Sequence, residues 1–304
     1  MKTVGKFTIG IAIIVFLSIR FSLADIFEAI KDVQISLLFF AVILYGFTLF
    51  LLSLRWRFIL KKMGHSLPPL VTYQAFSAGI LISDFTPARI GELSRPLTIR
   101  DRVPIPAGIG SVFLDRYCDF VAIFILGCGG ILLIFAALSQ ILLLIMAFVL
   151  LIPIILLSLL WVRRSWVFGA VHRFRFARLS DFTNHLGVAM DSLENPKRTM
   201  TAAILFTLII WIFQSLRIVI IAAAAGFSLP IQELILIQPL ISALALLPIS
   251  ISGLGFVEGG YVTLFTQYGI PAASGLGIAL IDRGDDISQS CASLLNINNQ
   301  ISAL

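Results

Sequence analysis

Charged residues concentrate in one short segment of this chain, between long apolar runs. The segment from Thr86 to Asp119 holds nine of them, although only 12% of the 304 residues are charged. They are Arg89, Glu92, Arg95, Arg100, Asp101, Arg102, Asp115, Arg116 and Asp119. Ionisable groups beside membrane-length apolar sequence are costly unless partners or a cavity surround them, which indicates a functional role. A cytoplasmic loop with ordinary surface charge would explain Arg100–Arg102, but not Asp115 or Asp119 in an otherwise hydrophobic stretch.

The composition defines the fold class. Hydrophobic residues make up 59% of the chain and the mean hydropathy is +1.03, whereas soluble domains carry about 25% charged residues. The apolar runs do not alternate as the strands of a β-barrel would. We therefore predict an all-α, polytopic membrane helical bundle, with residues 1–304 as a single integral membrane domain. The three cysteines form no C-x-x-C pair and the three histidines are scattered, so we predict no metal site and no cofactor.

Two parts of the chain resemble each other in order. The matching positions are Arg55 and Arg217 (217 − 55 = 162), Gly64 and Gly226 (226 − 64 = 162), Glu92 and Glu258 (258 − 92 = 166), and Asp115 and Asp282 (282 − 115 = 167). Each glycine opens a G-x-S-L-P motif, and each aspartate opens a D-R-x-x-D motif. The offset grows by about one helical turn. An ordered series of this kind indicates an internal duplication, with repeat 1 at about 35–137 and repeat 2 at about 199–295.

Two segments have the pattern of a helical hairpin. Pro68–Arg102 consists of two halves around a Thr-Pro break, and each half has about 16 residues, fewer than the roughly 20 that span a bilayer. Pro230–Tyr268 turns in the same way at P-I-S-I-S-G-L-G. We predict that both are re-entrant hairpins. Irregular backbone at membrane depth is tolerated only where it is buried in protein or lines a cavity.

Six spans are predicted around these hairpins. They comprise residues 7–19, 35–60, a third from 105, 141–160, 200–225 and a sixth from 271. The first could instead be a cleaved signal peptide ending at Ala24, but we favour an uncleaved span. The basic segment at about 163–195 is expected to lie in the cytoplasmic membrane interface. Docking of a soluble partner is the alternative for that segment.

The basic residues set the orientation. In this arrangement 16 of the 22 Lys and Arg residues lie on one side, which the positive-inside rule places in the cytoplasm of a prokaryotic inner membrane, together with the N-terminus. The chain makes three crossings, the second, third and fourth spans, between the entry to the second span and the entry to the fifth, and an odd number inverts the second copy. The sequence therefore predicts an inverted-topology repeat with one hairpin entering from each face. That arrangement is typical of transporters, whose sites lie near the midplane.

The two hairpin tips supply the predicted site. Thr86 is expected to cap a half-helix that starts at Pro87, and the glycines of the other tip allow close backbone approach. Arginine binds phosphate bidentately. The predicted lipid- or anion-binding residues are Arg55, Thr86, Arg89, Glu92, Arg116, Arg217, Ser252, Gly253, Gly255, Glu258 and Arg283. The predicted charge-pairing residues are Asp115, Asp119, Asp282 and Asp286.

Several pairings stay open at this stage. Arg89 could pair with Glu92, and Arg116 and Arg283 with the aspartates three residues after each. Arg55 and Arg217 need an anionic partner at their depth. Glu92, Glu258 and a lipid phosphate all fit, and we favour the phosphate. Asp115 and Asp282 could instead carry protons.

The motifs T-P-A-R-I-G-E-L-S-R, L-D-R-Y-C-D and P-I-S-I-S-G-L-G-F-V-E resemble the transmembrane region of lysylphosphatidylglycerol synthases and of stand-alone flippase-like membrane proteins. The resemblance runs from about Leu37 to Arg283. It implies lipid translocation, or support of lipid-linked glycan or aminoacyl-lipid pathways. After Arg283 the chain departs from the family, because Gly284–Leu304 is polar and asparagine-rich where an apolar span is expected. Truncation, a frameshift and divergence would each explain this departure.

We therefore expect a flippase-like protein that binds or translocates an anionic phospholipid or a polyprenyl-phosphate-linked lipid. No catalytic motif is present in the sequence, so we expect no enzymatic activity and no lipid aminoacylation by this chain alone. The alternative is a membrane scaffold or accessory subunit for a lipid-linked glycosyl- or aminoacyl-transferase. Membrane lipids are the expected partners, and nucleic acid is not. A homo-oligomer and a transferase partner stay open.

The topology can be tested by labelling single cysteines from each face of the membrane. Cysteines that replace Ser66 and Ser180 should react from the cytoplasmic side, and one that replaces Ser228 from the outer side. Labelling of positions 66 and 228 from the same face would contradict the inverted repeat.

Overall fold

The structure is a computed structural model that describes residues 33–86, 89–134, 191–246 and 250–285, with a few isolated positions besides. These residues form helices and contain no β-strand. The predicted first span, most of the fourth span, most of the basic interfacial segment, Pro87 and Asp286 lie outside the described residues. Within the described ranges, the all-helical prediction is confirmed.

Two of the described helices, α3 and α10, are long and apolar. Helix α3 covers Ile35–Lys62 and helix α10 covers Pro196–Ala224, with 28 and 29 residues. At 1.5 Å per residue each is about 42 Å long, more than the roughly 30 Å of a bilayer core. Both are apolar and long enough to cross a membrane. Their bounds agree with the second and fifth predicted spans to within a few residues.

The repeated G-x-S-L-P motif has a local structural cause. Gly64 and Gly226 follow the two helices with φ of 86° and 83°, a conformation that glycine adopts without strain. The residue after each glycine donates to a carbonyl five residues back, His65 to Leu60 and Phe227 to Ala222, both at 2.9 Å. This is the Schellman motif that satisfies the last helical carbonyls. Both copies therefore end their long helix in the same way.

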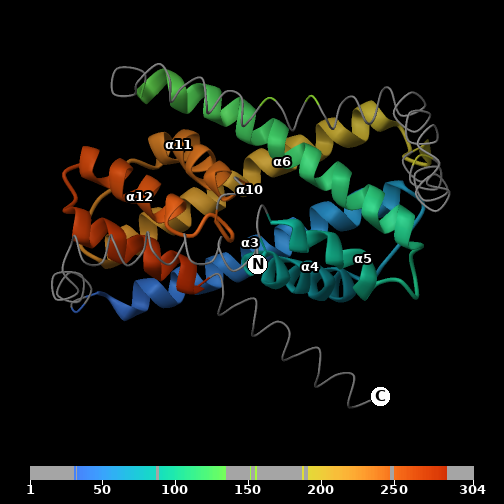
Figure 1. The fold of residues 1–304 in the computed structure, drawn as a ribbon, viewed down its shortest axis with the longest axis horizontal. Coiled ribbons are helices and arrows are strands. Elements are labelled where there is room, and N and C mark those ends of the chain that lie inside the picture. The colour runs from blue at the N-terminus through green and yellow to red at the C-terminus, as the bar shows by residue number, and fades with distance from the viewer. Residues whose placement is uncertain are drawn as a thin grey trace, which may run out of the picture.

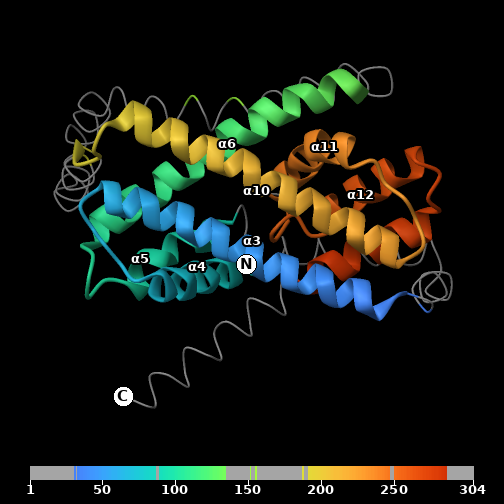
Figure 2. The ribbon, with the colours of Figure 1, turned by 180° about the vertical axis from the view of Figure 1, so that it is seen from behind.

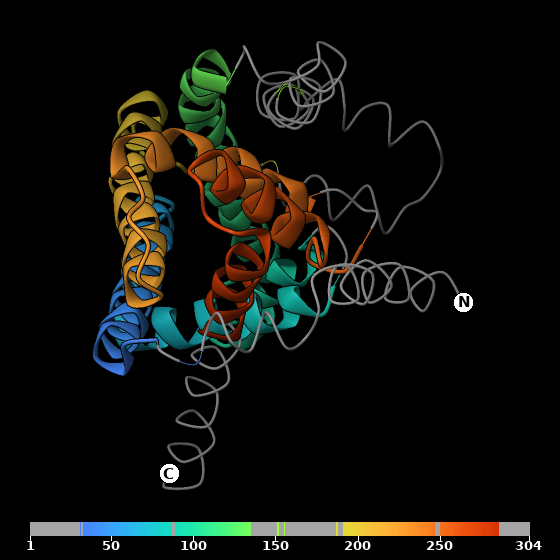
Figure 3. The ribbon, with the colours of Figure 1, turned by 90° about the vertical axis from the view of Figure 1, so that its left-hand side faces the viewer.

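Helices α3 and α10 lie side by side and run antiparallel (Figures 2 and 3). At one end the Gln34 amide donates to the Ala224 carbonyl at 2.9 Å, and at the other the Glu194 amide donates to the Lys62 carbonyl at 2.8 Å. The Lys62 ammonium also donates to the Glu194 side chain and lowers the pKa of that exposed carboxyl. The start of α3 is thus bonded to the end of α10, and the start of α10 is bonded to the end of α3.

Both predicted hairpins fold back on themselves at a non-helical tip. In the first, α4 (Pro69–Asp84) is followed by the 3₁₀ segment η1 (Ile90–Ser94) and the single turn α5 (Arg95–Thr98). In the second, α11 (Ile231–Ala243) and η2 (Leu244–Leu246) precede α12 (Phe256–Gln267). The two hairpins lie toward opposite ends of the molecule (Figure 1).

The return half of the first hairpin is shorter than the expected 16 residues. Pro96 lacks an N–H and stands within the first turn of α5, where the 3₁₀ segment ends and a new turn begins. Residues 99–104 are already non-helical. The helical part of this half is therefore 90–98, shorter than α4.

Helix α6 (Ile105–Ile134) begins at the predicted start of the third span and packs against α3, α10 and α11. The last described helix covers residues 272–285 and occupies the predicted position of the sixth span. Each half has its own core, formed from matching positions. Leu67 and Ile99 belong to one, and Leu229 and Phe265 belong to the other (229 − 67 = 162; 265 − 99 = 166).

The outward faces of the two long helices are apolar. The exposed side chains are Phe39, Ile43, Phe47 and Phe50 on α3 and Leu205, Ile209 and Ile212 on α10. Three pairs of these positions are separated by the offset of 162 residues: Ile43 and Leu205, Phe47 and Ile209, and Phe50 and Ile212. A continuous apolar face on a long helix is what lipid-facing surfaces require.

The tightest approach in the first hairpin can be tested by one substitution. A methyl group at Gly91 would stand 2.5 Å from backbone atoms of Ile82 and Ser83. Such overpacking costs about 1–3 kcal/mol, so Gly91→Ala should lower the thermal unfolding temperature in detergent. Gly259→Ala is the matched control, because a methyl group there meets nothing within 4 Å. Equal stability of the two variants would contradict this packing.

Candidate functional site

A cavity of about 350 Å³ lies between the two halves. Both hairpins and both long helices contribute to its lining, through tip residues such as Phe85, Arg89, Ser252 and Leu254. The lining repeats in sequence. It includes Glu92 and Glu258, Arg116 and Arg283, and Ile80 and Ser242 (242 − 80 = 162). Matching positions of the two similar parts of the chain therefore line one cavity.

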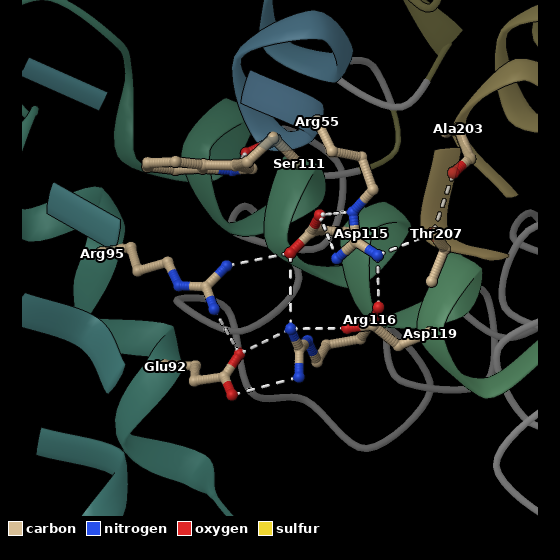
Figure 4. A network of polar contacts seen from close by, with 10 residues as sticks. Arg55, Glu92, Arg95, Ser111, Asp115, Arg116, Asp119, Ala203 and Thr207 are labelled. Atoms are coloured by element: carbon tan, nitrogen blue, oxygen red, sulfur yellow. Dashed lines mark hydrogen bonds and ion pairs between the residues drawn. The ribbon is translucent and has the colours of Figure 1, made fainter. Parts of the chain in front are cut away.

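Arg55 is fully buried on α3 and has three side-chain partners (Figure 4). Its Nε donates to Asp115 at 2.8 Å, and its Nη1 donates to Asp119 and, at 2.7 Å, to the Thr207 hydroxyl. The two aspartates stand four residues apart on α6, so they share one face of that helix. A guanidinium is a planar fork of donors and can bind several acceptors in this way.

Arg95 is also fully buried and completes the other side of the network. Its Nη1 donates to the second oxygen of Asp115 at 2.9 Å, and its Nη2 donates to Glu92. The guanidinium carbon lies 3.7 Å from the ring centre of Phe76 and 5.8 Å from that of Trp56. Aromatic faces stabilise a desolvated cation by up to about 2 kcal/mol.

Arg116 connects the carboxylate partners of Arg55 with those of Arg95. Its Nη2 lies 3.0 Å from Glu92 and 2.6 Å from Asp119. Three arginines thus share three carboxylates, so the network carries no net charge in its fully ionised form. Buried ions are tolerated only with this kind of complete pairing, because removing them from water is expensive.

The second half contains the corresponding pairs. Arg217 contacts Asp282 at 2.5 Å, which matches the Arg55–Asp115 pair. Arg283 contacts Glu258, which matches the Arg116–Glu92 pair. Glu258 also accepts the Gly255 amide at 2.7 Å and thereby caps the start of α12.

Each half also reaches across to the other. Arg55 donates to Thr207 of α10, and the guanidinium of Arg217 lies 4.5 Å from the ring centre of Tyr45 on α3. Tyr45 and Thr207 are themselves equivalent positions (207 − 45 = 162). The two arginines therefore contact the same position of the opposite long helix, and the antiparallel packing makes the contacts reciprocal.

Arg89 differs from the other predicted arginines. It lines the cavity, and within the described residues it forms no ion pair or hydrogen bond, with its Nε buried and without a partner. The expected pair with Glu92 is not formed, because Glu92 is held by Arg95 and Arg116. Arg89 has a left-handed φ of 54°, and its equivalent, Gly255, has a φ of 84° (255 − 89 = 166).

That conformation costs a residue with a side chain about 1–2 kcal/mol, whereas glycine adopts it freely. The first half has an arginine where the second has glycine. A strained residue that persists at a cavity is an indication of function.

Thr86 has a role other than the predicted one. Its hydroxyl accepts a hydrogen bond from the Gly91 amide at 2.8 Å, and the helical segment starts at Ile90 with Arg89 in the N-cap position. The prediction of a half-helix that starts at Pro87 is therefore wrong, because the chain first passes through the left-handed turn at Arg89. At the other tip, Ser252 and Gly253 have φ of 47° and 69°, and the Ser252 carbonyl accepts from Arg283 at 3.4 Å.

Sequence reasoning missed Arg95 and its aromatic neighbours. Arg95 counts as a cytoplasmic flanking charge in the orientation argument, but it is fully buried. Its spacing of three residues from Glu92 was an available indication of an ion pair. Tyr45, Trp56 and Thr207 gave no comparable indication, because their contacts come from helices distant in sequence.

The carboxylates of the site are occupied by arginines. Among the described residues, no group of three or more His, Cys, Asp or Glu side chains could hold one. Glu92, Asp115 and Glu258 are bound by guanidinium groups. Among the described residues, what this arrangement offers a ligand is Arg89 at the first tip, a cavity-lining cation that forms no ion pair.

Long apolar helices with charges paired between them are typical of helical membrane proteins, and comparison with known proteins agrees. Residues 4–285 match the family model described as the lysylphosphatidylglycerol synthase TM region, so the chain belongs to that family. Two relatives from Methanothermobacter thermautotrophicus, each named UPF0104 membrane protein, are both 23% identical. The alignments cover 93% and 90% of this chain and 89% and 88% of the relatives. No solved structure matches the chain.

The Arg217–Asp282 pair can be tested by a double-mutant cycle. Arg217→Gln strands a buried carboxylate, and removal of one partner of a buried pair costs about 3–5 kcal/mol. Arg217→Gln and Asp282→Asn should each lower the unfolding temperature in detergent. The double variant should regain much of the loss, because no uncompensated charge remains. Additive losses would show that the two side chains act independently.

Proposed function

We propose that this protein binds a lipid with an anionic head group in the cavity and carries it between the two leaflets of a prokaryotic inner membrane. The observation that carries the proposal is Arg89, a cavity-lining guanidinium without a partner among the described residues. A guanidinium is the side chain best suited to bind a phosphate diester, because its donors match the phosphate oxygens. The other cavity arginines already have carboxylates.

The size of the cavity limits which part of the lipid it can hold. A volume of about 350 Å³ is at the lower end of ordinary small-ligand pockets. We propose that the head group occupies it while the acyl chains remain in the bilayer. The apolar outer faces of α3 and α10 are suited to that arrangement.

We further propose that the halves form an inverted-topology repeat and that the hairpins are re-entrant, with the N-terminus in the cytoplasm. The proposal is supported by the antiparallel packing of α3 and α10 and by the reciprocal contacts of Arg55 and Arg217. If both helices cross the membrane, an axis that exchanges them lies in the membrane plane. Inverted-repeat transporters expose a central site alternately by moving one repeat against the other.

In such a cycle the ion pairs would neutralise the buried charges while the halves move. An unpaired charge inside a membrane protein is expensive. Pairs that lie mostly within one half, such as Arg116 with Glu92 and Arg283 with Glu258, can stay intact while the halves move. The cross-contacts to Thr207 and Tyr45 are the ones that movement would change.

Reconstitution into liposomes tests the proposal. A leaflet assay with fluorescent phosphatidylglycerol should record lipid movement in the wild type and at least a tenfold loss in Arg89→Gln. Arg89→Lys should retain part of the rate, because lysine keeps the charge but lacks the bidentate fork. Arg102→Gln, in an exposed loop outside the cavity, is the matched control and should behave as the wild type. Equal rates for Arg89→Gln and the control would overturn the proposed role of Arg89.

A further inference from the structure

The cavity has two chemically different sides, although equivalent positions of the duplication form them. The first half contributes Leu52, Phe76 and Ile80, and the second half contributes Gln214, Gln238 and Ser242 at the same three positions (214 − 52 = 238 − 76 = 242 − 80 = 162). At these three positions the first half is apolar and the second half offers neutral hydrogen-bonding groups, while the charged side chains of the first half, such as Arg89 and Glu92, stand at other positions of the lining.

Two threonines in the lining do not alter this contrast. Thr48 and Thr207 donate to carbonyls one turn back in their own helices, at 2.8 Å each. The polar side is therefore a feature of the second half, and it carries no formal charge at these three positions.

Gln238 is the most informative of these residues. It is only 2% exposed, its Nε2 lies 3.5 Å from the Gln214 carbonyl, and its Oε1 is buried without a hydrogen-bond partner. Only the NH₂ end of the amide can donate to a carbonyl, so this contact favours the orientation in which Oε1 points away from Gln214. A buried acceptor left unsatisfied costs about 1–3 kcal/mol. The Oε1 atom therefore calls for a ligand that donates a hydrogen bond.

Arg89 and Gln238 make opposite demands on the same ligand. The guanidinium only donates, so it selects an anion, and the Gln238 Oε1 only accepts, so it selects an O–H or N–H group. A phosphate diester has no donor of its own. An ammonium group would need a carboxylate. Glu92, Asp119, Glu258 and Asp282 of the cavity lining are already bound by arginines, and Asp84, the remaining carboxylate of the lining, also has a partner. A hydroxyl group meets the requirement without adding charge.

We infer that the head group is a neutral, polyhydroxylated ring of the glycosyl or inositol type, joined to the phosphate that Arg89 binds. The inference rests on the proposed function and names its substrate class. Such a ring has hydroxyl groups along its edge and C–H groups on its faces. Its hydroxyls suit the Gln214, Gln238 and Ser242 side, and its C–H face suits the apolar side. Sites that pair a substrate hydroxyl in this way reject analogues that lack it.

The experiment compares fluorescent phosphatidylinositol, phosphatidylmethanol and phosphatidylethanolamine, which differ only in the head group, in liposomes that contain the wild-type protein. Phosphatidylinositol and phosphatidylmethanol carry the same single negative charge, and only the former has a polyhydroxylated ring. Phosphatidylinositol should move at least about tenfold faster, which corresponds to roughly 1.4 kcal/mol. Gln238→Leu should lower its rate to that of phosphatidylmethanol and leave the latter rate unchanged. Ser242→Ala, a milder change, should lower the phosphatidylinositol rate part of the way.

Two controls separate a binding effect from a folding effect. Gln267→Leu makes the same chemical change at an exposed position at the end of α12 and should leave both rates unchanged. Unfolding temperatures of all variants in detergent identify any that fail to fold, and Ser242→Ala then provides the test in place of Gln238→Leu.

The outcomes distinguish this inference from the proposed function. Equal movement of both lipids in the wild type would overturn the polyhydroxylated head group and leave lipid translocation standing. Faster movement of phosphatidylethanolamine than of phosphatidylinositol would replace the hydroxyl donor by an ammonium group and overturn the inference as well. Movement of none of these lipids would overturn the proposed function together with the inference.

Discussion

The architecture depends on the pairing of buried guanidinium groups with carboxylates. Arg55 and Arg95 are fully buried, and each would be intolerable in an apolar bundle without its partners on α6 and η1. Pairing therefore constrains which helices can be neighbours. Asp115 must face both α3 and the first hairpin, and this single carboxylate fixes the position of α6 relative to both. The second half meets the same constraint with fewer groups, since Tyr261 stands at the position equivalent to Arg95 (261 − 95 = 166).

The cavity lies where the two similar halves of the molecule meet. Two similar halves that pack through antiparallel long helices bring equivalent hairpin tips to opposite sides of one space. Divergence between the copies then gives that space its chemical character. Arg89 replaces a glycine at one tip, and Gln238 stands where the other half has Phe76. The differences between the repeats, more than their similarities, therefore define what the cavity can bind. A perfectly repeated site would offer the same groups on both sides and could not orient an asymmetric ligand.

The strained backbone supports the same view. Three non-glycine residues among those described have a positive φ, and two of them, Arg89 and Ser252, lie at the hairpin tips and line the cavity. Strain of this kind costs about 1–3 kcal/mol for each residue and persists where the surrounding structure maintains it. At the first tip the Gly91 amide and the Thr86 hydroxyl hold the turn. At the second, Glu258 holds the Gly255 amide while Arg283 holds Glu258.

The sequence by itself determined the helical membrane class, the ordered similarity of its two parts and the ends of the long helices. These features depend on local chemistry: apolar length, an ordered motif series, and glycines that terminate helices. It also indicated that the charges of α6 need partners. Which partners they have was decided by the tertiary structure, because Arg55, Glu92 and Asp115 are far apart in sequence and meet only through packing. The tertiary structure also decided that Arg95 is buried and that Arg89 does not pair with Glu92. It likewise left the Gln238 Oε1 without a hydrogen-bond partner. The sequence does not indicate which of several possible partners each side chain contacts, because that choice depends on distances that only the folded chain sets.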